Sequence, residues 1–266
     1  MPGIFAEEHL TEIALDNAPL VKVLVQVRFP AITKIETPEG IQGFQERLRA
    51  RYPVTRQETA MTVIVGQAGP IQVPAQGTVW RMSEVDGPWT VVLARDFVAL
   101  ETSSYSNRED LLARWRGVLD ALDALEPGPA VYDRLGIRYV DRVVGDDFIE
   151  DLPNLVRSEI LGPTNITGVE DGVLLASVSQ ALFRLNSMQV KAAWGLVPEN
   201  AAIVPGLEPV AERSWMLDVD AFAEENSKMF SVDRIVENTR LGARHAYAFF
   251  RWVVTEDFLR RFGCDV

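Results

Sequence analysis

The chain has 266 residues and a formal net charge of −12, with 47% hydrophobic and 24% charged residues. These values are typical of a globular protein with a full core, and no apolar run is long enough to predict a membrane-spanning helix. The acidic excess is spread evenly over the two halves of the chain, which disfavours binding to nucleic acid. The first ten residues lack the basic start of a signal peptide, so we expect a soluble, cytoplasmic protein.

The first half of the sequence predicts a strand and a helix, followed by several strands and a second helix. Asp86-Gly87 between two alternating segments indicates a hairpin, and Asn107 is placed to cap a helix with an apolar stripe. In chain order, we expect a helical lead-in at 6–15, a strand at 20–29, a helix at 38–51, a strand at 59–66, a loop at 67–77, strands at 78–85, 89–93 and 97–102, and a helix at 107–125.

The second half repeats this order. Asn186-Ser187 predicts a tight turn between two strands, and Ser231 is placed to cap the longest helix. We expect a strand at 130–144, a short helix ending at 160, strands at 173–185 and 188–197, a loop at 198–212, a strand at 214–220, a helix at 231–253 and a last helical turn from 255.

Helices and strands do not alternate one for one along the chain, which favours the α+β class over a parallel α/β fold. The Glu-Pro-Gly-Pro segment at 126–129 is the clearest break between the halves. We therefore predict two similar halves, 1–126 and 130–266, each a mainly antiparallel sheet with a long packing helix. A single continuous domain is the alternative.

The segment 130–144 predicts a strand with arginines along one face, at Arg134, Arg138 and Arg142. The other face is apolar and includes Tyr139. A similar strand in the first half ends at Arg28. Guanidinium groups on a sheet need carboxylates, an anionic ligand or water.

Two interpretations of these arginines remain open. The first is an anion-binding pocket, with Arg28, Arg134, Arg138 and Tyr139 as the ligand-binding candidates. The second is structural ion pairing, because Asp218 and Asp220 share one face of a later strand. The second interpretation is favoured, with an Arg138–Asp218 cross-strand pair as its specific form.

No residue pattern predicts catalysis or a cofactor. The sequence has neither a phosphate-binding glycine motif nor a serine-hydrolase elbow. Two unlinked histidines and a single cysteine, Cys264, are too few for a transition-metal site. We therefore assign no catalytic residue, expect no metal and no cofactor, and predict no intrachain disulfide.

Four segments together resemble a sporadically distributed, uncharacterised bacterial protein family of about this length. These are P-L-V-K-V at 19–23, D-F-V-A-L-E-T-S-S-Y at 96–105, R-L-G-I-R-Y at 134–139 and W-M-L-D-V-D at 215–220, with Trp80 and Trp89 before the second. The resemblance brings no established activity or site residues. The family's patchy distribution implies an accessory role, as in defence or toxin–antitoxin loci.

The sequence thus favours a non-catalytic binding or interaction module, whose partner is an unknown protein or a small anionic ligand. The alternative is an enzyme that acts on an anionic small substrate in an arginine-lined cleft. Such an enzyme would need an acid or base beside those arginines. The sequence does not indicate an oligomeric state.

Overall fold

The computed structural model describes residues 3–6, 12–66, 69–166, 172–201, 204 and 206–264, with the backbone alone at 60–66, 69–76, 225 and 226. The chain divides into two compact units. The terminal unit comprises residues 1–22, 138–221 and 242–266, and the central unit comprises residues 23–137 and 222–241. These units differ from the sequence halves 1–126 and 130–266, because four long elements contribute residues to both units.

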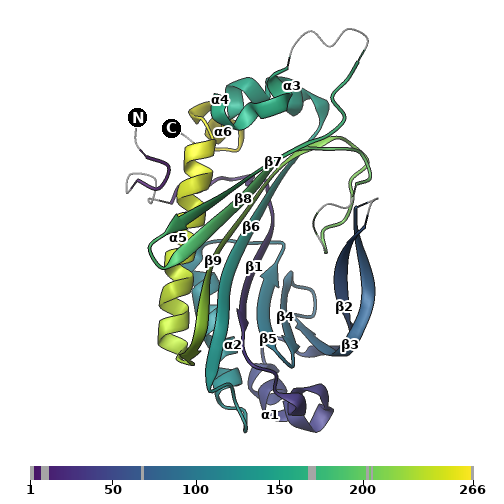
Figure 1. Ribbon diagram of the computed structural model, residues 1–266, viewed down its shortest axis with the longest axis vertical. Helices are drawn as coiled ribbons and strands as arrows, with labels where there is room; N and C mark the ends of the chain where they lie inside the picture. Colours follow the sequence, from purple (N-terminus) through teal and green to yellow (C-terminus); the bar gives the residue numbers. More distant parts are fainter. Residues whose placement is uncertain are drawn as a thin grey trace. The chain divides into compact units, whose positions relative to one another are not determined.

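The chain is an α+β protein with an antiparallel sheet (Figure 1). Its strands are β1 (Leu20–Arg28), β2 (Val54–Gly66), β3 (Gly69–Ser83), β4 (Trp89–Ala94), β5 (Phe97–Thr102), β6 (Val131–Val144), β7 (Ser177–Leu185), β8 (Met188–Val197) and β9 (Ser214–Met229). Its helices are α1 (Pro38–Leu48), α2 (Arg108–Asp123), α3 (Asp146–Leu155), α4 (Ser158–Leu161), α5 (Val232–Val253) and α6 (Glu256–Arg261), with 3-10 helices η2 (Thr33–Glu36) and η3 (Gly162–Asn165). None of the described helices is long and apolar enough to cross a membrane.

The strands follow the order β2-β3-β4-β5-β1-β6-β9-β8-β7. Outward from β1 the order is β5, β4, β3 and β2, and outward from β6 it is β9, β8 and β7. The two halves of the sequence therefore have the same strand connectivity, except that the described second half has no counterpart of β2. The duplication of the halves stays a prediction, and the shared strand connectivity supports it.

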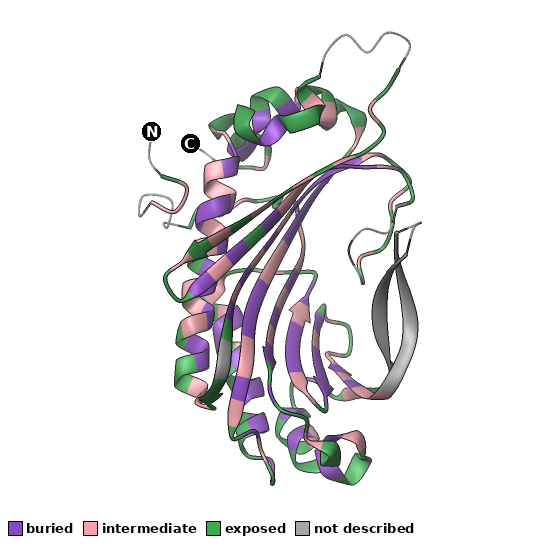
Figure 2. Ribbon diagram, in the orientation of Figure 1, coloured by how far each residue is buried: buried purple, intermediate pink, exposed green. Residues whose placement is uncertain are grey.

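In the central unit, antiparallel ladders join β1 to β5, β5 to β4, β4 to β3 and β3 to β2. Helix α2 begins after Asn107, whose side chain accepts a hydrogen bond from the backbone N–H of Asp110 at 2.9 Å. Residues spaced by three and four along α2 are fully buried (Figure 2), as the apolar stripe predicts: Leu111, Trp115, Val118, Leu119 and Leu122.

The terminal unit contains the β7–β8 hairpin, in which residues from Ser177 to Leu185 pair antiparallel with residues from Leu196 to Met188. Phe183 and Trp194 lie on the face that packs against α5, with ring centroids 5.7 and 6.3 Å from that of Phe249. We call this the helix face. On the opposite, open face of β7, the side chains of Val178 and Leu182 are exposed.

Four sequence predictions differ from the structure in the bounds of strands. The strand predicted at 59–66 begins five residues earlier, because β2 extends from Val54 to Gly66. The predicted loop at 67–77 is instead the start of β3 from Gly69 onward. The ladder between β3 and β4 covers only residues 79–83 of β3, so the earlier part of β3 pairs with β2 alone. A proline, which has no N–H to donate, is tolerated in a strand segment with a single partner. Strand β7 begins at Ser177 rather than 173, and β9 continues beyond 220 to Met229, where its sequence becomes polar.

Two helix predictions also differ from the structure. The predicted short helix ending at 160 is two helices, α3 and α4, separated at Val156-Arg157. Residues 7–11 of the predicted lead-in lie outside the described residues, and residues 12–15 are not helical.

Candidate functional site

Arg138 and Asp218 form a bidentate ion pair in the terminal unit. Nε and Nη2 of Arg138 donate to the two carboxylate oxygens of Asp218 at 2.7 and 2.5 Å. Burial lowers the pKa of Arg138, but the hydrogen bonds and charge of Asp218 and the charge of Asp220 outweigh it and raise the pKa above its usual value. This is the cross-strand pair that the alternation of the two strands predicts. Asp218 thus binds Arg138, the central one of the three arginines on this face of β6.

Arg142 lies four residues further along β6 on the same face and is buried, with 7% exposure. Its Nε donates to the hydroxyl of Ser214 at 3.0 Å and its Nη1 to the carbonyl of Glu208 at 2.9 Å. Burial lowers the pKa of Arg142. The segment that supplies Glu208 packs over this face through a small apolar cluster of Val140, Val197, Val204 and Met216, so protein atoms cover the arginine.

The other predicted ligand-binding residues are distributed over the two units. In the central unit, Arg28 is an exposed residue whose Nη2 lies 3.2 Å from Asp96, and the guanidinium of Arg134 lies 4.6 Å from the ring centroid of Phe222. In the terminal unit, Tyr139 is half-buried on β6 beside Arg138. Anion binding by these residues together stays a prediction.

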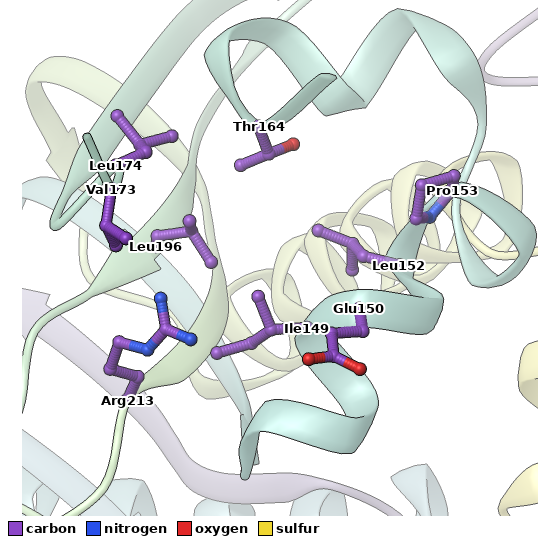
Figure 3. Close-up of a pocket in the computed structure, with 9 residues that line it drawn as sticks. All are labelled: Ile149, Glu150, Leu152, Pro153, Thr164, Val173, Leu174, Leu196 and Arg213. Atoms are coloured by element: carbon purple, nitrogen blue, oxygen red, sulfur yellow. The ribbon is translucent and has the colours of Figure 1, made fainter. Parts of the chain in front are cut away.

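A pocket of about 300 Å³ lies in the terminal unit between α3 and β8 (Figure 3). Ile149 and Leu152 from α3 face Leu196 from β8 across the space, and Thr164 from η3 and Arg213 lie at its ends. We call this space the α3–β8 pocket. Its lining is completed by Glu150, Pro153, Val173 and Leu174.

The N-terminal end of α3 is fixed beside the start of β9. Gly145 precedes the helix with a φ of 110°, a conformation that favours glycine. Its N–H donates to the carbonyl of Arg213 at 3.1 Å. The guanidinium of Arg213 in turn donates to Asp146 at 2.6 and 2.9 Å, and a carboxylate in the first turn also complements the helix dipole.

The C-terminal end of α3 is fixed against the junction of α5 and α6. Val156 forms an isolated antiparallel bridge with Val254. The hydroxyl of Thr255 donates to the carbonyls of Asn154 and Leu155 at 2.8 and 3.1 Å. Arg157 also donates to the carbonyl of Trp252. Contacts therefore hold both ends of α3, which forms one wall of the pocket.

The chemistry of the α3–β8 pocket suits binding better than catalysis. Six of its nine lining residues are aliphatic or proline. The guanidinium of Arg213 is bound to Asp146, and the hydroxyl of Thr164 donates to the carbonyl of Leu161. Glu150 is the single carboxylate in the described lining, with no histidine, cysteine or lysine beside it. Its volume lies at the lower end of the range for small-molecule sites.

A second pocket in the terminal unit, of about 640 Å³, is a poor site for a small anionic ligand, which is one of the two kinds of partner that the sequence left open. Its lining includes three carboxylates, from Asp146, Asp147 and Glu212, and one cation, Arg261. Arg261 is bound to Asp151 at 2.9 Å. Among the described residues, no group of histidines, cysteines and carboxylates could hold a metal ion.

Sequence reasoning missed one unusual titratable group, Asp141. It lies on the apolar face of β6 and is buried, and this burial together with the charge of Asp218 raises its pKa to about 7. The signal was present in the alternation, which places Asp141 on the same face as Ile137 and Val143. The pocket had no such signal, because its residues come from separate segments of the chain.

The comparisons with known proteins leave the family open. No family model and no curated protein matches the chain. It is similar to a solved structure, the crystal structure of DynU16, a protein in the dynemicin biosynthetic locus. The two are 12% identical, with 87% of this chain and 97% of that chain covered and a TM-score of 0.18. A TM-score this low carries no argument about fold or function.

Proposed function

We propose that this protein is a non-catalytic binding module, and that its α3–β8 pocket takes a compact ligand with an apolar body and one polar or anionic end. The observation that carries the proposal is the lining of this pocket. Six of its nine lining residues are aliphatic or proline, Arg213 lies at one end with its Nη1 outside the ion pair with Asp146, and the hydroxyl of Thr164 is hydrogen bonded.

The arginine-lined cleft of an enzyme has less support. Arg138 is bound to Asp218 through both carboxylate oxygens, and Arg142 is covered by the segment around Glu208. The segment around Glu208 would have to move to open Arg142, and a substrate would have to compete with Asp218 for Arg138. We also propose that the protein is cytoplasmic. Its single cysteine, Cys264, cannot form an intrachain disulfide, which is consistent with a reducing compartment.

Titration with 8-anilinonaphthalene-1-sulfonate tests the proposal, since this fluorescent probe has an apolar body and one anionic end. Val173 lines the pocket and is 69% exposed, while Val85 is 70% exposed in the β3–β4 connection. Val173→Asp and Val85→Asp therefore place the same charge at equally exposed valines, one inside and one outside the pocket. We expect Val173→Asp to weaken binding at least tenfold and Val85→Asp to leave it unchanged.

A second variant, Ile149→Glu, charges the α3 wall from a half-buried position. It should weaken binding as Val173→Asp does, and circular dichroism and thermal unfolding show whether each variant is folded. Equal probe affinity in folded Val173→Asp, Ile149→Glu and Val85→Asp would reject the pocket as the binding site.

A further inference from the structure

Strand β7 has a hydrogen-bonding edge that its counterpart in the first half does not have. In the described part of the chain, the ladder of β7 is with β8 alone, and β7 ends the strand order. By the shared connectivity, β7 corresponds to β3, which pairs with β4 on one side and with β2 on the other. Among the residues that the structure describes, none therefore fills beside β7 the position that β2 fills beside β3.

The sequence of β7 lacks the features that usually protect an edge strand. Natural edges are blocked by proline, by charged residues, by bulges or by a covering segment. The strand S-V-S-Q-A-L-F-R-L contains no proline and no acidic residue or lysine, and its single charge is Arg184 near its end. Its open face instead presents Val178 and Leu182, which are 64% and 59% exposed. Figure 2 shows the alternation of half-buried and exposed residues along the strand.

We propose that this edge pairs with β7 of a second copy of the chain, antiparallel and with Gln180 opposite Gln180. In this register Val178 of each copy lies opposite Leu182 of the other copy. The twofold axis therefore creates two identical contacts between these exposed apolar residues. A twofold contact of this kind is self-complementary and closed, so it ends at a dimer. It continues the sheet from one chain into the next.

The charges of the region are compatible with this register. Arg184 of one copy lies eight positions from Arg184 of the other along the paired strands, or about 27 Å. This separation exceeds the screening length of about 8 Å at physiological salt. The net charge of −12 opposes association in general, but β7 and β8 contribute no acidic residue to the contact.

Sedimentation of the full chain and of two charge variants tests the proposal. The native chain should sediment as a dimer. In Val178→Asp/Leu182→Asp, each aspartate faces an aspartate of the second copy, and we expect a monomer. In Val178→Lys/Leu182→Asp, each lysine faces an aspartate, and the dimer should return with at least tenfold higher affinity than in the double-aspartate variant. Both residues are exposed, so unchanged circular dichroism is expected in each case.

Disulfide formation tests the register itself in a Cys264→Ser background. Gln180→Cys should cross-link two chains on mild oxidation, whereas Arg184→Cys, which does not face its own copy, should not. A native chain that stays monomeric, a dimer unaffected by the double-aspartate change, or equal cross-linking of the two cysteine variants would each overturn the proposal. A β7 edge occupied only by a different protein would leave the native chain monomeric and would overturn it too.

Discussion

The guanidinium of Arg138 and the carboxylate of Asp218 meet with both carboxylate oxygens engaged, at 2.7 and 2.5 Å. The side chains are 31% and 14% exposed, so water screens the pair only in part. Removing one partner of a buried pair leaves an uncompensated charge. We expect this cost to exceed that of losing a surface ion pair.

Arg138→Ala should lower the free energy of unfolding by about 2 kcal/mol, because the charge of Asp218 then loses its counterion in a mostly buried site. Asp218→Ala should have a similar effect. The double variant should lose clearly less than the sum of the two, with a coupling of about 1 kcal/mol or more in urea unfolding. Strictly additive losses would show that the pair contributes nothing.

Asp141 should make stability depend on pH in the direction opposite to most carboxylates. Its pKa is raised from 3.8 to about 7 in the folded protein, so the folded state holds the proton more tightly than the unfolded state. The free energy of unfolding should therefore fall as the pH rises from about 4 to about 7 and then level off. The upper limit of this contribution is about 4 kcal/mol.

Asp141→Asn keeps the shape of the protonated side chain without the charge. This variant should be more stable than the native chain at pH 8, and the advantage should disappear near pH 4. Chemical unfolding at a series of pH values measures the difference, with Asp86→Asn in the exposed β3–β4 connection as the control. An advantage that is the same at every pH would contradict the assignment.

Gly195 and Gly117 should respond to alanine in opposite directions. A Cβ at Gly195 would lie 1.8 Å from the carbonyl oxygen of Ser177, and its φ is 150°. Gly195→Ala should therefore cost at least about 2 kcal/mol. Gly117 is an exposed residue of α2 with no atom within 4 Å of an added Cβ, so Gly117→Ala should gain about 1 kcal/mol. Thermal unfolding of both variants checks the prediction, and a stable Gly195→Ala would contradict the close approach of β7 and β8.

The sequence predicted the elements whose signals are local. Asn107 and Ser231 accept backbone hydrogen bonds at the starts of α2 and α5, and the Asp86-Gly87 segment connects two paired strands. Such signals depend on neighbouring residues, and they were sufficient for the α+β class. The prediction of a loop at 67–77 was wrong because a strand with one partner tolerates its prolines. The number of partners of a strand is a property of the whole sheet, which the local sequence does not show.

The candidate site was less accessible to sequence reasoning. The alternation of two strands was enough to name Arg138 and Asp218 together. The α3–β8 pocket instead combines Ile149, Val173, Leu196 and Arg213 from four segments. No spacing rule connects such positions, and the apolar residues among them are indistinguishable in sequence from ordinary core residues. The α3 wall of the pocket is held at both ends by hydrogen bonds to residues that are distant in the sequence.

The most direct test of the proposed binding module is methyl NMR of the chain titrated with 8-anilinonaphthalene-1-sulfonate. The pocket predicts that the largest shift changes occur at the methyl groups of Ile149, Leu152 and Leu196, which face the same space. The methyl groups of Val178 and Leu182 are equally apolar, more exposed within a single chain and outside the pocket, and they should change little. Changes concentrated at Val178 and Leu182, with the three pocket residues unaffected, would contradict the α3–β8 pocket as the ligand site.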